Sequence, residues 1–200
     1  HLDFRRQRQM CIRDRSWIAD IGHTTHLTTA DKDGNVVSLT QTIGPLMGSK
    51  VASKELGFLY AVTLGGYLGN YKPGDRANSH ISPTLILKNK YPILALGAAG
   101  GSRIITAITQ VSSRYLDQKK SLSESLMLPR VYPFNDTLQI ENHIGLEKIN
   151  AKLSQKITPF KLINSVARFG RVHAVAIDSV NKKWIGASDP DWEGTVEIHE

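Results

Sequence analysis

Residues 24–42 read TTHLTTADKDGNVVSLTQT, and this stretch decides the fold at the start of the chain. Residues 24–31 and 35–42 each alternate in side-chain polarity and are rich in β-branched side chains, which is typical of half-buried strands. The residues between them, Lys32, Asp33 and Gly34, have the composition of a tight turn. The stretch therefore predicts a β-hairpin that returns Thr42 to the start of the first strand, close to Thr24.

The rest of the chain mixes strand-like and helix-like segments. Seven glycines punctuate residues 44–80 and predict loops. Gly100 and Gly101 open a predicted helix, whose apolar face is formed by Ile104, Ile105, Ile108, Val111 and Tyr115. Further helices are predicted at 122–128 and 144–153, and strands at 85–88, 91–98, 131–134, 137–140, 171–177 and 183–187. Together these segments favour one domain with a layered α+β fold.

The composition is that of an ordinary soluble globular domain. The 200 residues are 40% hydrophobic and 22% charged, and such a chain can bury a core without disulfides or metal. No apolar run approaches the roughly 18 residues that a membrane span needs, and the arginine-rich start predicts no secretory signal. Five of the seven histidines, at 23, 26, 143, 173 and 199, have no metal-ligand spacing, and we expect no metal and no cofactor.

The positive charge is concentrated at the N-terminus. The formal net charge is +7, and residues 1–15 contain five arginines against Asp3 and Asp14. This segment has no apolar periodicity, and we interpret it as a non-native tail. A basic tail that binds nucleic acid or anionic lipid is the alternative. The single cysteine, Cys11, lies in this tail, so residues 16–200 exclude disulfides and thiol catalysis.

Five short motifs follow one another along the chain and carry a family resemblance. They are Thr24-Thr25-His26, Thr40-Gln41-Thr42, the run from Ser79 to Thr84, Gly100-Gly101-Ser102-Arg103-Ile104 and the closing Gly186-Ala187-Ser188-Asp189-Pro190. The series resembles the small-subunit region of the γ-glutamyltransferase (γ-glutamyltranspeptidase) family. That resemblance implies the four-layer αββα sandwich of N-terminal-nucleophile hydrolases, and a precursor that cuts itself between His23 and Thr24. Residues 16–23 would then end the large-subunit region, and residues 24–200 would form the small-subunit catalytic region.

A threonine at a chain terminus can be a nucleophile because its own α-amino group, with a pKa near 8, can serve as the base. The resemblance implies this role for Thr24, and it implies that Thr42 orients the nucleophile. It also implies that the backbone N–H groups of Gly100 and Gly101 hold the oxyanion, which suits glycines at a helix start. Without the resemblance, Thr24 would be interpreted as an ordinary strand residue and the glycine pair as a turn or an anion-binding nest. For Thr42, the pattern alone leaves an ordinary strand residue and an orienting group equally open.

The substrate is less well determined by the resemblance than the reaction. Ser79 matches a family serine that binds the α-carboxylate of the glutamyl group. His80 stands where the family has a second serine; it could donate a hydrogen bond to the substrate, or it could be an ordinary surface or core histidine. The family's carboxylate for the substrate α-amino group has no counterpart at residues 60–67, and Asp191 replaces a family arginine. An ammonium group buried without an opposing charge would be costly. The implied substrate is a γ-glutamyl amide such as glutathione, with another acyl amide as the alternative.

The resemblance also implies partners and a compartment. A large subunit from the same precursor would complete the fold, and no nucleic-acid partner is expected once residues 1–15 are set aside. The family places the protein in the periplasm or outside the cell. A non-catalytic relative, or a fragment that folds but cannot work, is the rival from a different functional class.

Overall fold

The computed structural model describes residues 23–63, 72–74, 79–142, 159–164, 169–191 and 194–198. The predicted hairpin is confirmed as strands β1 (Thr24–Ala30) and β2 (Val36–Thr42), which pair antiparallel with Thr24 opposite Thr42. Gly34 has a φ of 86° in the turn, a conformation that glycine adopts without strain. The carboxylate of Asp31 accepts the backbone N–H groups of Asp33 and Asn35, which closes the turn.

A four-stranded antiparallel sheet forms the centre of the domain. Its strand order is β3 (Thr84–Lys88), β4 (Tyr91–Ala99), β8 (Arg171–Ile177) and β9 (Trp184–Ser188). The predicted strands in these regions are confirmed to within one residue at each end. Residues 94–99 of β4 are all buried, because layers cover both faces of this central strand.

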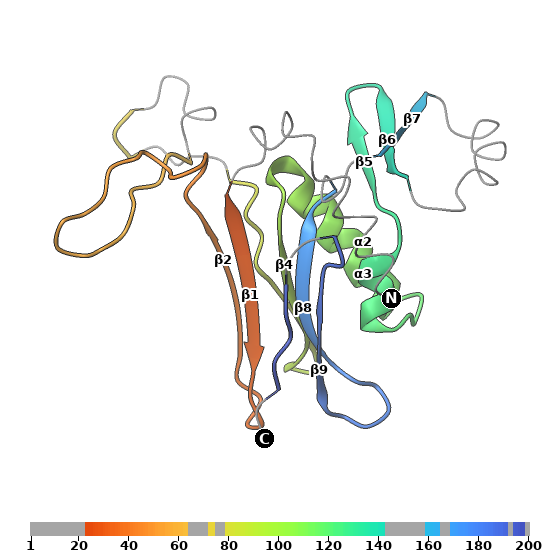
Figure 1. Cartoon of the computed structure of the whole chain (residues 1–200). Coiled ribbons are helices and arrows are strands. Elements are labelled where there is room, and N and C mark those ends of the chain that lie inside the picture. Colours follow the sequence, from red (N-terminus) through yellow and green to blue (C-terminus); the bar gives the residue numbers. More distant parts are fainter. Residues whose placement is uncertain are drawn as a thin grey trace.

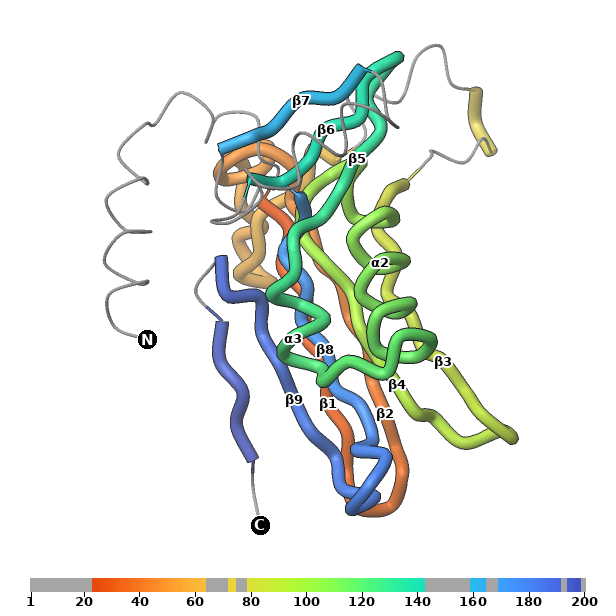
Figure 2. The backbone as a smooth tube through the Cα atoms, turned by 90° about the vertical axis from the view of Figure 1, so that its right-hand side faces the viewer, coloured from red at the N-terminus to blue at the C-terminus, as the bar shows by residue number. Residues whose placement is uncertain are grey.

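Two helices cover one face of the central sheet (Figures 1 and 2). A short 3-10 turn (Gly101–Arg103) leads into helix α2 (Ile104–Leu116), and α3 (Leu122–Met127) follows. Leu94, Leu96 and Ala98 of β4 project toward these helices and join the main core cluster. Ile105 is an exception to the predicted apolar face. It is 48% exposed, and Ala107 is buried instead, because Ile105 lies at the margin of the stripe that faces the sheet.

The β1–β2 hairpin stacks on the opposite face of the central sheet (Figure 1). Residues of β4 that point toward it are small, namely Ala95, Gly97 and Ala99, so the two sheets approach closely. The Ser38 hydroxyl donates to the Leu96 carbonyl oxygen at 3.1 Å, which fixes the hairpin along β4. The two helices, the four-stranded sheet and the two-stranded hairpin therefore stack as three layers.

A third sheet lies beyond α3 and contains β5 (Val131–Phe134), β6 (Thr137–Glu141) and β7 (Phe160–Ile163). The first two strands were predicted, whereas β7 pairs parallel to β6 and was not. The predicted helix at 144–153 and the tail at 1–15 lie outside the described residues. Among the helices that are described, none has the length and apolar character needed to cross a membrane.

Candidate active site

Thr24 and Thr42 meet at the open end of the hairpin. Their hydroxyl oxygens are 3.0 Å apart, with Thr24 donating to Thr42. The Thr42 oxygen also accepts the backbone N–H of Gly44 at 3.2 Å. Thr42 therefore has two donors on its oxygen, and its own proton is directed elsewhere.

That proton is directed at the carbonyl group of His23, which belongs to the peptide bond between His23 and Thr24. The Thr42 hydroxyl donates to the His23 carbonyl oxygen at 3.3 Å, and the Ile43 N–H donates to the same oxygen at 3.3 Å. The His23 N–H is itself held by the Gly44 carbonyl oxygen at 2.6 Å. Two donors on one carbonyl oxygen can stabilise negative charge that develops there.

The Gly100–Gly101 turn follows β4 at the same end of the two stacked sheets (Figure 1). The contact of Ser38 with Leu96 places the start of β2 beside the middle of β4, so Thr42, four residues later, is level with the end of β4. Gly100 has a φ of 147° and Gly101 a φ of 59°. A Cβ on Gly100 would lie 2.8 Å from the Cα of Gly170, so the turn needs glycine at this position.

His26, two residues after Thr24 on the same face of β1, packs directly on the backbone of β4. A Cβ on Gly97 would lie 2.3 Å from the imidazole, which explains the glycine in the middle of a buried strand. Nδ1 of His26 lies 2.7 Å from the Thr40 hydroxyl. Burial, and to a smaller extent the nearby His173, lower the pKa of His26 to about 4, so the imidazole is neutral near pH 7.

The two residues predicted to bind the substrate lie in the segment that leads into β3. The hydroxyl of Ser79 accepts the backbone N–H of Ile81 at 3.2 Å, and the carbonyl oxygen of His80 accepts the Ser82 hydroxyl at 3.2 Å. These contacts shape their own loop, and β3 is the edge strand next to β4. Of the predicted site residues, the structure brings together Thr24 and Thr42, with Gly100 and Gly101 at the same end of the sheets.

The sequence pattern of a protein family described as Gamma-glutamyltranspeptidase matches residues 5–198. The chain belongs to the gamma-glutamyltranspeptidase family. The Glutathione hydrolase proenzyme of Bacillus subtilis is 29% identical over 180 residues, which are 86% of this chain and 30% of the relative. The Acylase ACY 1 proenzyme of a Pseudomonas species is 30% identical over 175 residues, which are 82% of this chain and 31% of the relative.

A solved structure supports the same family. A threonine-to-alanine mutant of the gamma-glutamyltranspeptidase of Helicobacter pylori superposes with a TM-score of 0.71 at 29% identity. The match covers 84% of this chain and 100% of the solved chain. The chain thus spans about a third of the length of the proenzymes it matches.

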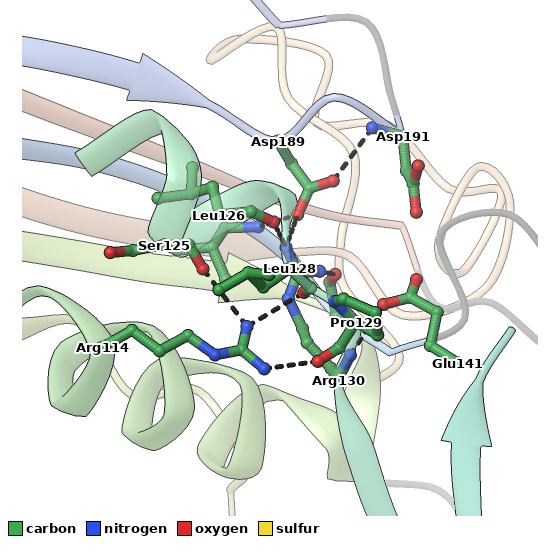
Figure 3. Close-up of polar contacts among 11 residues, drawn as sticks. Arg114, Ser125, Leu126, Leu128, Pro129, Arg130, Glu141, Asp189 and Asp191 are labelled. Carbon is green, nitrogen blue, oxygen red and sulfur yellow. Dashed lines mark hydrogen bonds and ion pairs between the residues drawn. The ribbon is translucent and has the colours of Figure 1, made fainter. Parts of the chain in front are cut away.

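This family member also contains a buried charged cluster that was not predicted from its sequence (Figure 3). Arg130 and Asp189 are each 1% exposed, and their side chains form an ion pair at 2.6 Å. Arg114 of α2 donates to the carbonyl oxygens of Ser125 and Leu128 at 3.2 and 2.9 Å, at the end of α3. The two partners of the ion pair are 59 positions apart, so no local pattern could have linked them.

The cluster also includes the carboxyl group of Glu141, whose protonated form is favoured by burial. Glu141 is 4% exposed, and its carboxylate accepts the Arg130 backbone N–H at 3.0 Å. Burial raises the pKa of Glu141, Arg130 opposes that change, and the charge of Asp191 adds to it. Among the described residues, no group of three or more His, Cys, Asp or Glu side chains could hold a metal ion.

Proposed function

We propose that this chain carries the nucleophile of an N-terminal-nucleophile amidohydrolase, which is made as a precursor and cuts itself between His23 and Thr24. The observation that carries the proposal is the 3.0 Å contact between the Thr24 and Thr42 hydroxyls beside the His23 carbonyl group. The relatives from Bacillus subtilis and Pseudomonas are named proenzymes, which is consistent with a precursor.

In the self-cleavage step, the Thr24 hydroxyl oxygen attacks the His23 carbonyl carbon. The Thr42 hydroxyl and the Ile43 N–H hold the charge that develops on the carbonyl oxygen. The C–N bond then breaks, the proton moves to the Thr24 nitrogen, and an ester joins His23 to the Thr24 oxygen. Water hydrolyses that ester and leaves Thr24 with a free α-amino group and a free hydroxyl group.

In the mature enzyme, the Thr24 α-amino group accepts the proton from the Thr24 hydroxyl as the oxygen attacks the substrate amide carbon. The N–H groups of Gly100 and Gly101 stabilise the oxyanion, and Thr42 orients the Thr24 hydroxyl. The leaving amine takes the proton, and an acyl-enzyme ester remains. Water or a second amine then releases the acyl group and restores Thr24.

The substrate we propose first is a γ-glutamyl amide such as glutathione, in keeping with the family. Ser79 and His80 would contact its glutamyl group. The loop that follows Thr42 is closed at its base by a hydrogen bond of 2.9 Å from the N–H of Val62 to the Ile43 carbonyl oxygen. No carboxylate lies at this base to hold a substrate α-ammonium group. The only carboxylate among residues 43–63 is Glu55, which lies within the Ser53–Gly57 turn at the far end of that loop.

The apolar character of this loop supports a second candidate, an acylase acting on a substrate without an α-ammonium group. Seven large apolar side chains of the loop are at least 43% exposed, namely Leu46, Met47, Val51, Leu56, Phe58, Tyr60 and Val62. Val62 is at the base of the loop, where its N–H donates to the carbonyl oxygen of Ile43, the residue after Thr42. Such side chains fit an apolar acyl chain better than a charged amino acid.

We further propose that the rest of the precursor completes a four-layer αββα sandwich. The fourth layer would cover the outer face of the hairpin, where Leu27, Val37 and Leu39 are 45%, 52% and 39% exposed. Leu27 and Leu39 are cross-strand partners, so they form one apolar patch on that face.

The experiment compares the hydrolysis of a γ-glutamyl anilide with that of an unbranched acyl anilide by the full-length protein. We expect kcat/KM to favour the γ-glutamyl compound, and a preference for the acyl anilide would establish the acylase alternative. Thr24→Ala should abolish both activities, and Thr109→Ala, whose side chain is exposed on α2, is the matched control. Equal rates for Thr24→Ala and the wild type would overturn the assignment of the nucleophile.

A further inference from the structure

The Gly100–Arg103 turn contacts the start of β5 and the segment before β8. Tyr132 of β5 donates its hydroxyl to the Ser102 hydroxyl oxygen at 2.9 Å. The same ring lies under the guanidinium group of Arg103, with 4.7 Å between the guanidinium carbon and the ring centroid. One aromatic side chain therefore holds two consecutive residues of the turn.

A second contact reaches the turn through Gly170. The Cα of Gly170 occupies the space next to Gly100, where a Cβ on Gly100 would be only 2.8 Å away. Gly170 itself has a φ of 89°, and a Cβ on it would lie 2.7 Å from the Ala107 side chain of α2. Gly170 is thus wedged between the turn and the first part of α2, and its position limits the position of Gly100.

Gly170 is held by Arg130. The guanidinium group of Arg130 donates to the Gly170 carbonyl oxygen at 2.5 Å and to the Leu126 carbonyl oxygen at 2.6 Å. Asp189 neutralises this buried cation, and its carboxylate also accepts the Val172 N–H at 3.0 Å (Figure 3). A buried charge with a paired partner and hydrogen bonds on both sides is fixed in position.

Arg130 and Tyr132 belong to one short segment that is itself attached to α2. The residue between them, Val131, exchanges two hydrogen bonds of 2.9 Å with the Gln110 side chain, one through its N–H and one through its carbonyl oxygen. The segment 130–132 therefore contacts the Gly100–Arg103 turn twice, directly through Tyr132 and indirectly through Arg130 and Gly170. We call residues 130–132 the β5 brace.

We infer that the β5 brace sets the direction of the backbone N–H groups of Gly100 and Gly101, and that Arg130 and Tyr132 are positioning residues for the oxyanion site. This inference rests on the proposed function of that turn. An oxyanion donor acts on the transition state more than on the bound substrate, so a displaced donor lowers kcat and leaves KM nearly unchanged.

The test uses Tyr132→Phe in the full-length protein, because this change keeps the ring and removes one hydrogen bond. We expect kcat to fall about fivefold to tenfold with KM within twofold of the wild type. Ser102→Ala should give the same loss, and the double variant should lose no more than either single variant. The matched control is Tyr91→Phe, since Tyr91 is 74% exposed at the other end of β4.

Amide hydrogen exchange of the peptide that covers residues 100–103 gives a readout that does not depend on activity. In Tyr132→Phe its exchange should be about fivefold to tenfold faster than in the wild type, and in Arg130→Lys faster still. If the wild type hydrolysed no amide, the proposed function would fail, and the exchange rates would still decide whether the brace exists. Unchanged exchange and unchanged kcat in Tyr132→Phe would overturn the inference, even if Arg130→Lys did not fold.

Discussion

Thr24 and Thr42 face each other across the open end of the β1–β2 hairpin, and their hydroxyl oxygens lie 3.0 Å apart. The antiparallel register creates this contact, because it places the first residue of β1 opposite the last residue of β2. The same register brings the Thr42 hydroxyl to the carbonyl group that precedes Thr24. One turn of the chain therefore assembles the candidate nucleophile, its orienting group and the bond to be cut.

Thr42→Val removes that orienting hydroxyl and keeps the shape and β propensity of the side chain. We expect self-cleavage at His23–Thr24 to slow by about 10- to 100-fold, because the His23 carbonyl oxygen loses one of two donors. The rate is measured by following the precursor band with time after rapid purification. Thr109→Val, at an exposed position on α2, is the control and should process like the wild type. Normal processing of Thr42→Val would contradict the role of its hydroxyl.

Gly100→Ala should destabilise the fold by at least about 2 kcal/mol, because the new methyl group meets the Gly170 backbone and the φ of 147° is strained for alanine. Gly34→Ala also has a positive φ, of 86°, but nothing lies within 4 Å of the added carbon. It should therefore cost only about 1 kcal/mol. Urea unfolding of both variants measures the difference. Equal midpoints would show that the turn is not packed against Gly170.

His26 predicts a loss of stability in acid. Its pKa is about 4 in the folded protein, against an ordinary histidine pKa of 6.5, so the unfolded chain binds the extra proton between these two pH values. The free energy of unfolding should therefore fall as the pH is lowered from 6.5 to 4, by about 2–3 kcal/mol from this residue. His26→Gln should flatten this part of the curve. The remaining slope should come partly from His173, whose pKa burial also lowers. Identical slopes in variant and wild type would count against a buried neutral His26.

Leu39→Asp tests the proposed fourth layer on the outer face of the hairpin. In the full-length protein it should lower the melting temperature far more than Leu87→Asp, because a charge under a covering layer is desolvated. Leu87 is 59% exposed on the edge strand β3 and serves as the matched control. Small and equal changes in both variants would mean that the outer face stays open to water.

Local patterns in the sequence accounted for the hairpin, the strands of the central sheet and the glycine turn that starts α2. These features depend on side-chain alternation and turn residues, which act between neighbours in the chain. The proximity of Thr42 to Thr24 followed from the position of the turn at Lys32, Asp33 and Gly34. The sequence could not show that Arg130 pairs with Asp189 or that Gly170 packs on Gly100, because long-range packing alone creates those contacts.

β7 shows the same limit in the secondary structure. Its four residues, Phe160–Ile163, pair parallel to β6, which ends at Glu141, so the two strands are not neighbours in the sequence. A strand this short also carries little periodicity. The exposure of Ile105 has a similar cause, since the sequence gives the apolar stripe of α2 but not its angle to the sheet.

The most direct test of the central claim is intact-mass analysis of the full-length protein and of its Thr24→Ala variant, each purified under identical conditions. The wild type should separate under denaturing conditions into two chains, one of which begins at Thr24, and Thr24→Ala should remain a single chain. An uncut wild type, or a Thr24→Ala variant that is cut at the same bond, would contradict the claim that Thr24 is the nucleophile.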